Sequence, residues 1–312
     1  VELCCSPQTA TLPLLDWTLT MTGILNVVGT NWEGQDGIYT GDLLMGSDGA
    51  NSLEGLKGND TILGYGGNDI LIGGQGDDSL DGGAGNDTIY GGTASDAAST
   101  GNDSIDGGDG NDAIYMAKGL DLNDVIVGGA GTDTLYFTPV GGAGHATDLD
   151  NVSDVERIVL GASSQAVSLT LTGDQLPEGD LTIDGSALTG TFTVDGSAVE
   201  TFNLFVIGGS GNNILTGGSG NDTLYGGASA DTLTGNDGDD YLRGYGGNDS
   251  LIGGEGWDTL DGGTGADTLE GGLGENYFIA STGDDTLYGG EEADTLDFSG
   301  LSATNLQVGV DD

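Results

Sequence analysis

Residues 217–297 read GGSGNDTLY GGASADTLT GNDGDDYLR GYGGNDSLI GGEGWDTLD GGTGADTLE GGLGENYFI ASTGDDTLY GGEEADTLD, and this stretch decides the fold. It is a run of nine-residue units in which glycines precede an acidic or amide residue at the sixth place and an apolar residue at the eighth. A fixed short period is typical of repeat architectures, in which each unit packs only on its neighbours. We therefore predict a solenoid for this part of the chain.

The same unit recurs in the first half of the chain. It runs in register up to residue 92, is interrupted by an insertion at Ala94–Thr100, and then resumes in a looser form. We call the sixth-place residue of each unit its anchor. The anchors are Asp42, Asn51, Asp60, Asp69, Asp78, Asp87, Asp103, Asp112, Asp124 and Asp133 in the first array, then Asn213, Asp222, Asp231, Asp240, Asp249, Asp258, Asp267, Asn276, Asp285 and Asp294 in the second.

An apolar residue lies two places after every anchor. A glycine-rich turn followed by three residues is too short for a helix, but it fits a short strand whose middle side chain points inward. Two units then close one coil, and the apolar row becomes a narrow core. The predicted fold is an all-β parallel β-roll or β-helix solenoid. The apolar row is Leu44, Leu53, Ile62, Leu71, Leu80, Ile89, Ile105, Ile114, Ile126, Leu135, Leu215, Leu224, Leu233, Leu242, Leu251, Leu260, Leu269, Phe278, Leu287 and Leu296.

The charge balance of the chain is strongly acidic. Among 312 residues there are 51 Asp plus Glu against 4 Lys plus Arg, which gives a formal net charge of -47. Four cations cannot form the basic face that binds phosphate, so we expect neither a nucleic-acid partner nor adhesion to an anionic membrane. No run of 18 apolar residues is present, so we also expect no membrane span.

The acidic anchors imply a cation between successive coils. Stacking places anchors 18 residues apart, such as Asp60 and Asp78, at a spacing of about 4.8 Å, where like charges repel strongly. Calcium takes 6 to 8 oxygen ligands and suits carboxylates together with carbonyls of glycine turns, whereas magnesium retains water. One ion for each such pair gives four in the array from 42 to 87 and eight in that from 213 to 294, or about a dozen Ca²⁺.

The predicted calcium ligands are the aspartate anchors. Asparagine stands at the anchor place in Asn51, Asn213 and Asn276, and the units that begin at Gly64, Gly235, Ala280 and Gly289 lack one or more turn glycines, so we expect weaker or empty sites there. The candidate metal ligands are Asp42, Asp60, Asp69, Asp78, Asp87, Asp103, Asp112, Asp124, Asp133, Asp222, Asp231, Asp240, Asp249, Asp258, Asp267, Asp285 and Asp294.

The repeat resembles that of a known family. GGAGNDTIY at residues 82–90 and GGSGNDTLY at residues 217–225 match the nonapeptide G-G-x-G-x-D-x-U-x of the repeats-in-toxin (RTX) family of secreted bacterial proteins. The resemblance covers about residues 37–136 and 208–297. It implies a right-handed parallel β-roll with calcium in the turns, export by a type I system, and an extracellular or cell-surface location.

The repeats divide the chain into five parts. Residues 1–36 are an apolar cap or an assembly strand, 37–136 the first β-roll, 137–206 a calcium-poor stretch of β-rungs, 207–297 the second β-roll and 298–312 a C-terminal segment. A separate small β domain is the alternative for 137–206. VERIVL in this stretch, at residues 155–160, resembles linker rungs of bacterial surface-layer proteins. Its alternating pairs are Ile158/Leu160, Leu169/Leu171, Leu181/Ile183, Phe192/Val194 and Phe202/Leu204.

Few residues are left over for catalysis. The chain has one histidine, His145, which we interpret as a loop residue, and its two cysteines, Cys4 and Cys5, are either free thiols or an intermolecular crosslink. We therefore expect a non-enzymatic structural protein of the bacterial surface, a surface-layer or filament subunit that assembles with identical subunits and has cell-surface polysaccharide as a second candidate partner. The alternative is an export and folding module of a larger secreted enzyme, toxin or adhesin.

Overall fold

The computed structural model describes residues 18–19, 26–28, 41–92, 101–116, 120, 123–139, 149–172, 179–200 and 202–299. Every regular element within these ranges is a β-strand, and no helix in this part of the chain is long and apolar enough to cross a membrane. Cys4, Cys5, His145 and most of the 1–36 and 298–312 segments lie outside the described residues.

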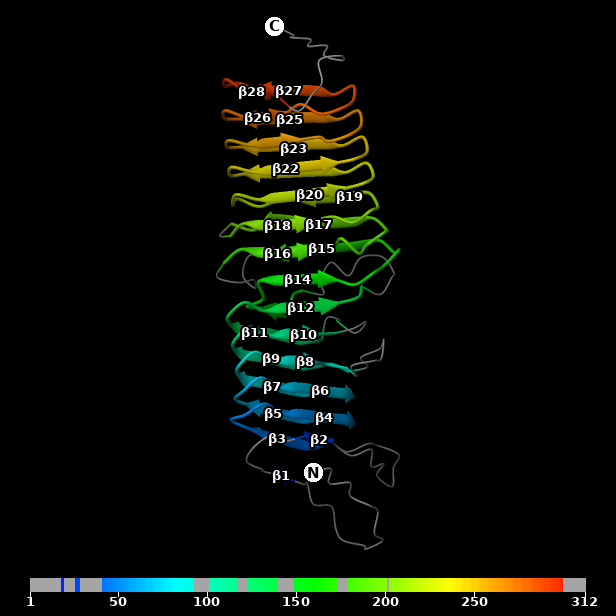
Figure 1. The fold of residues 1–312 in the computed structure, drawn as a ribbon, viewed down its shortest axis with the longest axis vertical. Helices are drawn as coiled ribbons and strands as arrows, with labels where there is room; N and C mark the ends of the chain where they lie inside the picture. The colour runs from blue at the N-terminus through cyan, green and yellow to red at the C-terminus, as the bar shows by residue number, and fades with distance from the viewer. Residues whose placement is uncertain are drawn as a thin grey trace, which may run out of the picture. The chain divides into compact units, whose positions relative to one another are not determined.

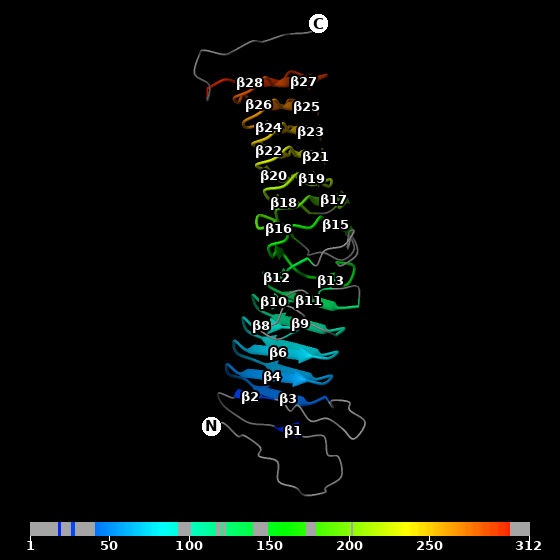
Figure 2. The same cartoon turned by 90° about the vertical axis from the view of Figure 1, so that its right-hand side faces the viewer.

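The chain forms two compact units. Unit 1 comprises Val1–Ser163 and Asp174–Asp184, and unit 2 comprises Ser164–Gly173 and Gly185–Asp312. In each unit, successive strands alternate between two sheets, which we call columns. Odd-numbered strands form one column and even-numbered strands form the other (Figure 2).

Unit 1 contains a sheet ordered β1-β3-β5-β7-β9-β11-β13 and a second column ordered β2-β4-β6-β8-β10-β12-β14-β16. Its strands are β1 (Thr18–Leu19), β2 (Asn26–Val28), β3 (Leu43–Ser47), β4 (Ser52–Lys57), β5 (Thr61–Tyr65), β6 (Ile70–Gln75), β7 (Ser79–Ala84), β8 (Thr88–Tyr90), β9 (Ser104–Asp109), β10 (Ala113–Tyr115), β11 (Val125–Ala130), β12 (Thr134–Phe137), β13 (Val152–Ser153), β14 (Arg157–Leu160) and β16 (Leu181–Asp184).

Unit 2 contains a sheet ordered β15-β17-β19-β21-β23-β25-β27 and a column ordered β18-β20-β22-β24-β26-β28. The strands from β17 to β28 stack coil upon coil (Figure 1). They are β15 (Val167–Thr172), β17 (Phe192–Ala198), β18 (Leu204–Ile207), β19 (Asn213–Thr216), β20 (Thr223–Gly227), β21 (Thr232–Asp237), β22 (Tyr241–Tyr245), β23 (Ser250–Glu255), β24 (Thr259–Asp261), β25 (Thr268–Leu273), β26 (Tyr277–Ile279), β27 (Thr286–Gly290) and β28 (Thr295–Asp297).

Within each unit, successive strands of a sheet pair in parallel and are two places apart in the chain, so that two nine-residue units make one coil. Leu44 lies opposite Ile62, and Leu53 lies opposite Leu71. The register survives the insertion after residue 92, because Leu80 lies opposite Ile105. These pairings confirm the predicted parallel β-roll.

The apolar row forms the core as predicted, and nearly every member is at most 3 % exposed. The exceptions are Leu287, which is 37 % exposed, and Leu296, which is half-buried. Both belong to the β27/β28 coil, on which no further strand is paired among the described residues. Within the described residues, one side of that coil is not covered by another strand.

Some turns keep their shape although a glycine is missing. Gly254 has a φ of 130°, the left-handed region that glycine enters without steric cost. Tyr65 and Asn236 occupy the same place in their own repeats with φ values of 73° and 81°. The repeats that begin at Gly64 and Gly235 therefore retain the turn, with a strain that a bulky residue rarely accepts.

The described residues between 137 and 206 form paired strands that bury large apolar side chains. Ile158 lies between Leu135 and Ile183 in the register of unit 1, and Leu169 lies opposite Val194 in unit 2. Phe192 and Val199 are completely buried. Strands β14 and β16 belong to unit 1, and β15, β17 and β18 belong to unit 2.

Candidate metal sites

The anchors form hydrogen-bonded ladders along the turns. In each ladder the backbone N–H of one anchor donates to the side-chain oxygen of the anchor in the next coil. Asp60 N–H donates to Asp78 Oδ1 at 2.8 Å, and Asp240 N–H donates to Asp258 Oδ1 at 2.9 Å. The ladders are Asp42–Asp60–Asp78–Asp103–Asp124 and Asn51–Asp69–Asp87–Asp112–Asp133 in unit 1, and Asn213–Asp231–Asp249–Asp267–Asp285 and Asp222–Asp240–Asp258–Asn276–Asp294 in unit 2.

The ladders also join anchors of successive coils that are not 18 residues apart in the sequence. Asp78 N–H donates to Asp103 Oδ1 across 25 residues, and Asp103 N–H donates to Asp124 Oδ1 across 21 residues. Asp133 N–H then donates to Glu156 Oε2 at 2.6 Å. Glu156 was not among the predicted ligands, although it directly precedes β14 as Asp133 directly precedes β12. That position before a strand was the available signal.

Most anchors carry a buried oxygen that has no hydrogen-bond partner. Oδ1 accepts the ladder hydrogen bond, whereas Oδ2 has no donor and no exposure to solvent. Buried polar atoms are nearly always paired, so a repeated series of orphans implies a ligand such as a metal ion. The orphan atoms are Oδ2 of Asp60, Asp69, Asp78, Asp87, Asp112, Asp133, Asp231, Asp240, Asp249, Asp258 and Asp267.

Every orphan oxygen except that of Asp133 lies over a glycine that precedes its anchor by five residues. A Cβ on Gly226 would collide with Asp231 Oδ2 and with the carbonyl oxygen of Gly244 in the next coil. Gly73 is related in the same way to Asp78 and to the carbonyl of Gly91. The absence of a side chain at these glycines therefore lets a carboxylate oxygen and a backbone carbonyl oxygen approach the same space.

Burial raises the pKa of the anchor carboxyls. Desolvation brings the pKa of Asp60 and Asp231 from 3.8 to about 6, against the lowering effect of the ladder hydrogen bonds. The pKa of Asp78 and Asp240 rises to about 8, because burial is greater and neighbouring carboxylates add to it. Negative charge in these ladders is therefore costly unless a cation compensates it.

The donor set fits a hard cation. In the described ranges no three His, Cys, Asp or Glu side chains converge on one point, so an ion would need backbone carbonyls to complete its ligands. Carboxylate and carbonyl oxygens suit calcium, and the absence of nitrogen and sulfur donors from these ladders argues against zinc. Each site would be held by two stacked anchors and by the carbonyls of their glycine turns.

The predicted ligands are not equivalent. Asp42, Asp285 and Asp294 are only half-buried. Asp222 is buried, but its Oδ2 accepts a hydrogen bond from its own turn, from Gly218 N–H at 2.6 Å. The fully buried orphans in the middle of each ladder are therefore the best candidates for metal binding.

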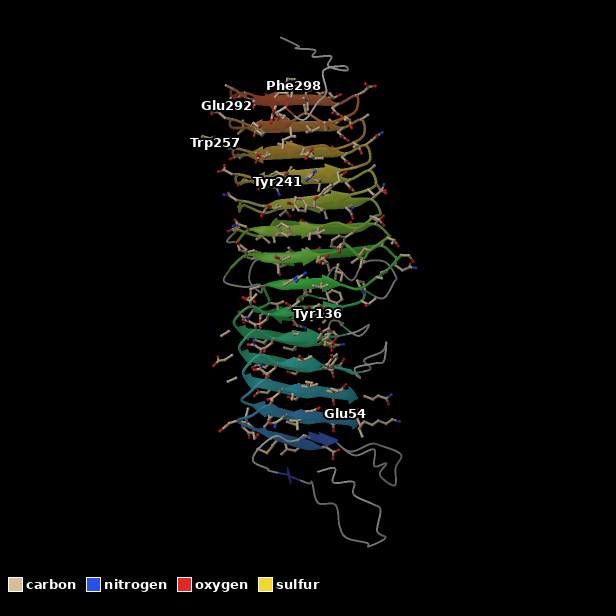
Figure 3. The ribbon with its side chains drawn as sticks, in the orientation of Figure 1. Glu54, Tyr136, Tyr241, Trp257, Glu292 and Phe298 are labelled. Atoms are coloured by element: carbon tan, nitrogen blue, oxygen red, sulfur yellow. The ribbon has the colours of Figure 1, made fainter. Side chains whose placement is uncertain are left out.

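A second, exposed ladder runs beside the anchors. The residue before an anchor accepts a hydrogen bond from the coil that follows, as Asn221 Oδ1 does from Asp239 N–H at 2.9 Å. Asp239 Oδ1 likewise accepts from Trp257 N–H at 2.8 Å. Trp257 and Glu292 project from this side of unit 2 (Figure 3). These side chains are solvated and need no ion, so they are suitable controls for the anchors.

Comparison with protein families identifies one match. Its description is the RTX calcium-binding nonapeptide repeat (4 copies), and it covers residues 36–71, 45–80, 63–97, 97–122, 118–136, 207–242, 234–269 and 270–300. Together these matches include more than half of the chain. No curated protein matches the chain.

Proposed function

Because the chain belongs to the family of RTX calcium-binding nonapeptide repeats, we propose that it is a secreted, calcium-dependent structural protein of the bacterial cell surface, a subunit of a surface layer or an extracellular filament. The repeats bind calcium, are typical of extracellular proteins exported by type I systems, and form β-rolls that are typically structural. The observation that carries the proposal is the series of buried Oδ2 atoms without a donor.

Calcium would act here as part of the fold. An ion between two stacked carboxylates neutralises their repulsion and supplies the partner that each orphan oxygen lacks. An unfolded chain presents no such site, so the binding free energy contributes to folding. We expect the rolls to be unfolded at the low calcium concentration of a cytosol and ordered outside the cell.

The stacked pairs of the ladders support a different distribution of ions from that of an 18-residue count. Stacked pairs of two carboxylates number eight in unit 1, where Asp133 with Glu156 is the last, and five in unit 2. One ion for each pair keeps the total at about a dozen and shifts the larger share to unit 1.

Self-assembly is proposed from the β27/β28 coil. Leu287 belongs to the core row but is 37 % exposed, and Tyr288 beside it is 57 % exposed. Strands with unpaired backbone groups and uncovered apolar side chains readily pair with another chain. A second copy of this chain is the proposed partner, and cell-surface polysaccharide is a further candidate.

Electron microscopy of the purified chain tests the proposal. We expect ordered sheets or filaments in millimolar calcium and none in chelator. Leu287→Asp should abolish assembly, whereas Ile214→Asp, which changes an exposed apolar residue of the same sheet, should not. Particles that stay monodisperse under all conditions would instead favour an export and folding module of a larger secreted protein.

A further inference from the structure

Asn213, the first anchor of the unit 2 roll, lies where the residues of its column change from apolar to acidic. Register pairs Val167 with Phe192 and Phe192 with Asn213, and Asn213 N–H donates to Asp231 Oδ1 in the next coil. The anchor column therefore passes from two buried apolar residues through one amide to a row of aspartates. Asn213 is itself 1 % exposed.

The side-chain amide of Asn213 lies among four oxygen atoms. Nδ2 donates to Asp231 Oδ1 at 2.8 Å, and it lies 2.9 Å from the carbonyl oxygen of Gly211, 3.2 Å from that of Gly226 and 3.3 Å from that of Gly209. An NH₂ group has only two hydrogens to donate. One carboxylate oxygen and three carbonyl oxygens around one point are instead the surroundings that a hard cation takes.

The remaining oxygen of Asn213 is also satisfied within the turn. Its Oδ1 accepts a hydrogen bond from Gly209 N–H at 3.1 Å. One coil further on, Asp231 Oδ2 has no donor at all. Asn276 replaces an aspartate too, but its Nδ2 donates only to the carbonyl of Gly274, at 3.1 Å. Of these turns, the one at Asn213 is closed by its own side chain.

We propose that the Asn213 amide takes the place of a calcium ion, so that the first turn of the unit 2 roll closes without metal and serves as a base for the calcium-bound coils after it. This inference rests on the proposed calcium-dependent fold. The column explains why an amide is needed here. An ion at this turn would have the carboxylate of Asp231 in the next coil but only the buried, apolar Phe192 at the paired position of the preceding coil, whereas a neutral amide tolerates an apolar neighbour.

Counting bound calcium by native mass spectrometry tests the inference. Asn213→Asp should bind one more ion than the unchanged protein. Asn212→Asp is the matched control, because it makes the same substitution one residue away at an exposed side chain and should leave the count unchanged. Equal counts for the two variants would overturn the inference, whereas an unchanged protein that binds no calcium would overturn the proposed function instead.

Hydrogen exchange in chelator provides a second measurement that does not need an added ion. The amide of Gly209, which donates to Asn213 Oδ1 within the turn, should stay protected in the unchanged protein. It should lose at least about tenfold protection in Asn213→Ala, which removes the side-chain amide without adding a charge. Asn213→Ala should also bind the same number of ions as the unchanged protein. Protection that survives the loss of the amide would show that the side chain does not close this turn.

Discussion

The rolls and the rungs hold their coils together by different means. In the roll of unit 1, β5 buries one apolar side chain, Ile62, together with Gly64. In unit 2, the rung strand β15 buries Val167, Leu169 and Leu171. The rung therefore places an apolar side chain at the column position where the roll has an anchor.

The difference indicates that a solenoid coil can be stabilised either by burying more apolar side chains or by binding cations. A rung strand that buries two or three side chains gains about 1.5–3 kcal/mol for each, whereas a roll strand buries one and adds a desolvated carboxylate. The roll can close only if something compensates that carboxylate. Calcium, which the repeats of this family bind, is the proposed compensation in the rolls. The rung strand β15 instead buries apolar side chains.

Removing calcium should have the largest effect and should separate the two regions. An ion present at 100 times its Kd contributes about 2.7 kcal/mol, so several ions together match the 5–15 kcal/mol stability of an ordinary domain. In chelator we expect amides of the rolls, such as those of Asp60 and Asp240, to exchange rapidly, and the amide of Val194 in a rung to remain protected. Hydrogen exchange with and without calcium measures this. Equal loss in both regions would contradict the comparison.

Truncation of the core should have the next largest effect. Leu251 is completely buried, and Leu251→Ala should lower the free energy of unfolding of the calcium-bound form by about 2–5 kcal/mol. Ile252→Ala, at a half-buried neighbour on the same strand, should cost less than about 1 kcal/mol. Denaturant titration in calcium measures both.

The corresponding rung variant sharpens the comparison. Leu169→Ala should lose local protection against hydrogen exchange to the same extent in calcium and in chelator, because we expect no ion to contribute to that strand.

Leu251→Asp should abolish folding of the roll even in calcium, because it buries an unpaired charge in the core. A roll that tolerates Leu251→Asp would contradict the register.

Removing one anchor charge should have a smaller and local effect. Asp240→Asn keeps the acceptor for Asp222 N–H but replaces the orphan Oδ2 with an NH₂ group. Because Asp240 is stacked between Asp222 and Asp258, we expect the loss of one or two bound ions. Asp239→Asn makes the same charge change at an exposed side chain and should leave the ion count unchanged. Native mass spectrometry compares the two variants.

The sequence predicted the periodic parts of the molecule. The nine-residue period located the strands, the buried row and the stacking of Asp60 with Asp78, because regular coils depend on local spacing alone. It could not locate pairs across insertions, such as Asp78 with Asp103, since loop length carries no periodic signal. Glu156 was missed for the same reason.

The sequence also did not predict that the anchor column of unit 2 changes from apolar to acidic residues. Phe192 lies in the same column as Asn213, but their separation of 21 positions breaks the period, and a buried phenylalanine does not resemble an anchor. The alternating pattern did predict that Phe192 and Val194 point inward. Their place in the anchor column follows only from the pairing of β17 with β19.

Acid should change the stability of the rolls in opposite directions with and without calcium. In the metal-free roll the pKa of Asp78 and Asp240 is about 8 and that of Asp60 about 6, all above the unfolded value of 3.8. The folded state therefore binds protons more tightly than the unfolded chain does. Lowering the pH from about 8.5 towards 4 should therefore shift the roll in chelator towards the folded state, measured as a gain of β-sheet circular dichroism, with most of the gain complete below about pH 5.

With saturating calcium the melting temperature should instead fall over the same interval, because protons compete with the ion for the same carboxylates. Asp240→Asn removes one group with a pKa of about 8. It should therefore flatten the chelator curve over the whole interval from about pH 8 down to about pH 4. Asp239→Asn should leave most of that slope in place. If both curves fell together on acidification, the anchor carboxyls would not be the groups that couple protons, calcium and folding, and the contrast between rolls and rungs would need another cause.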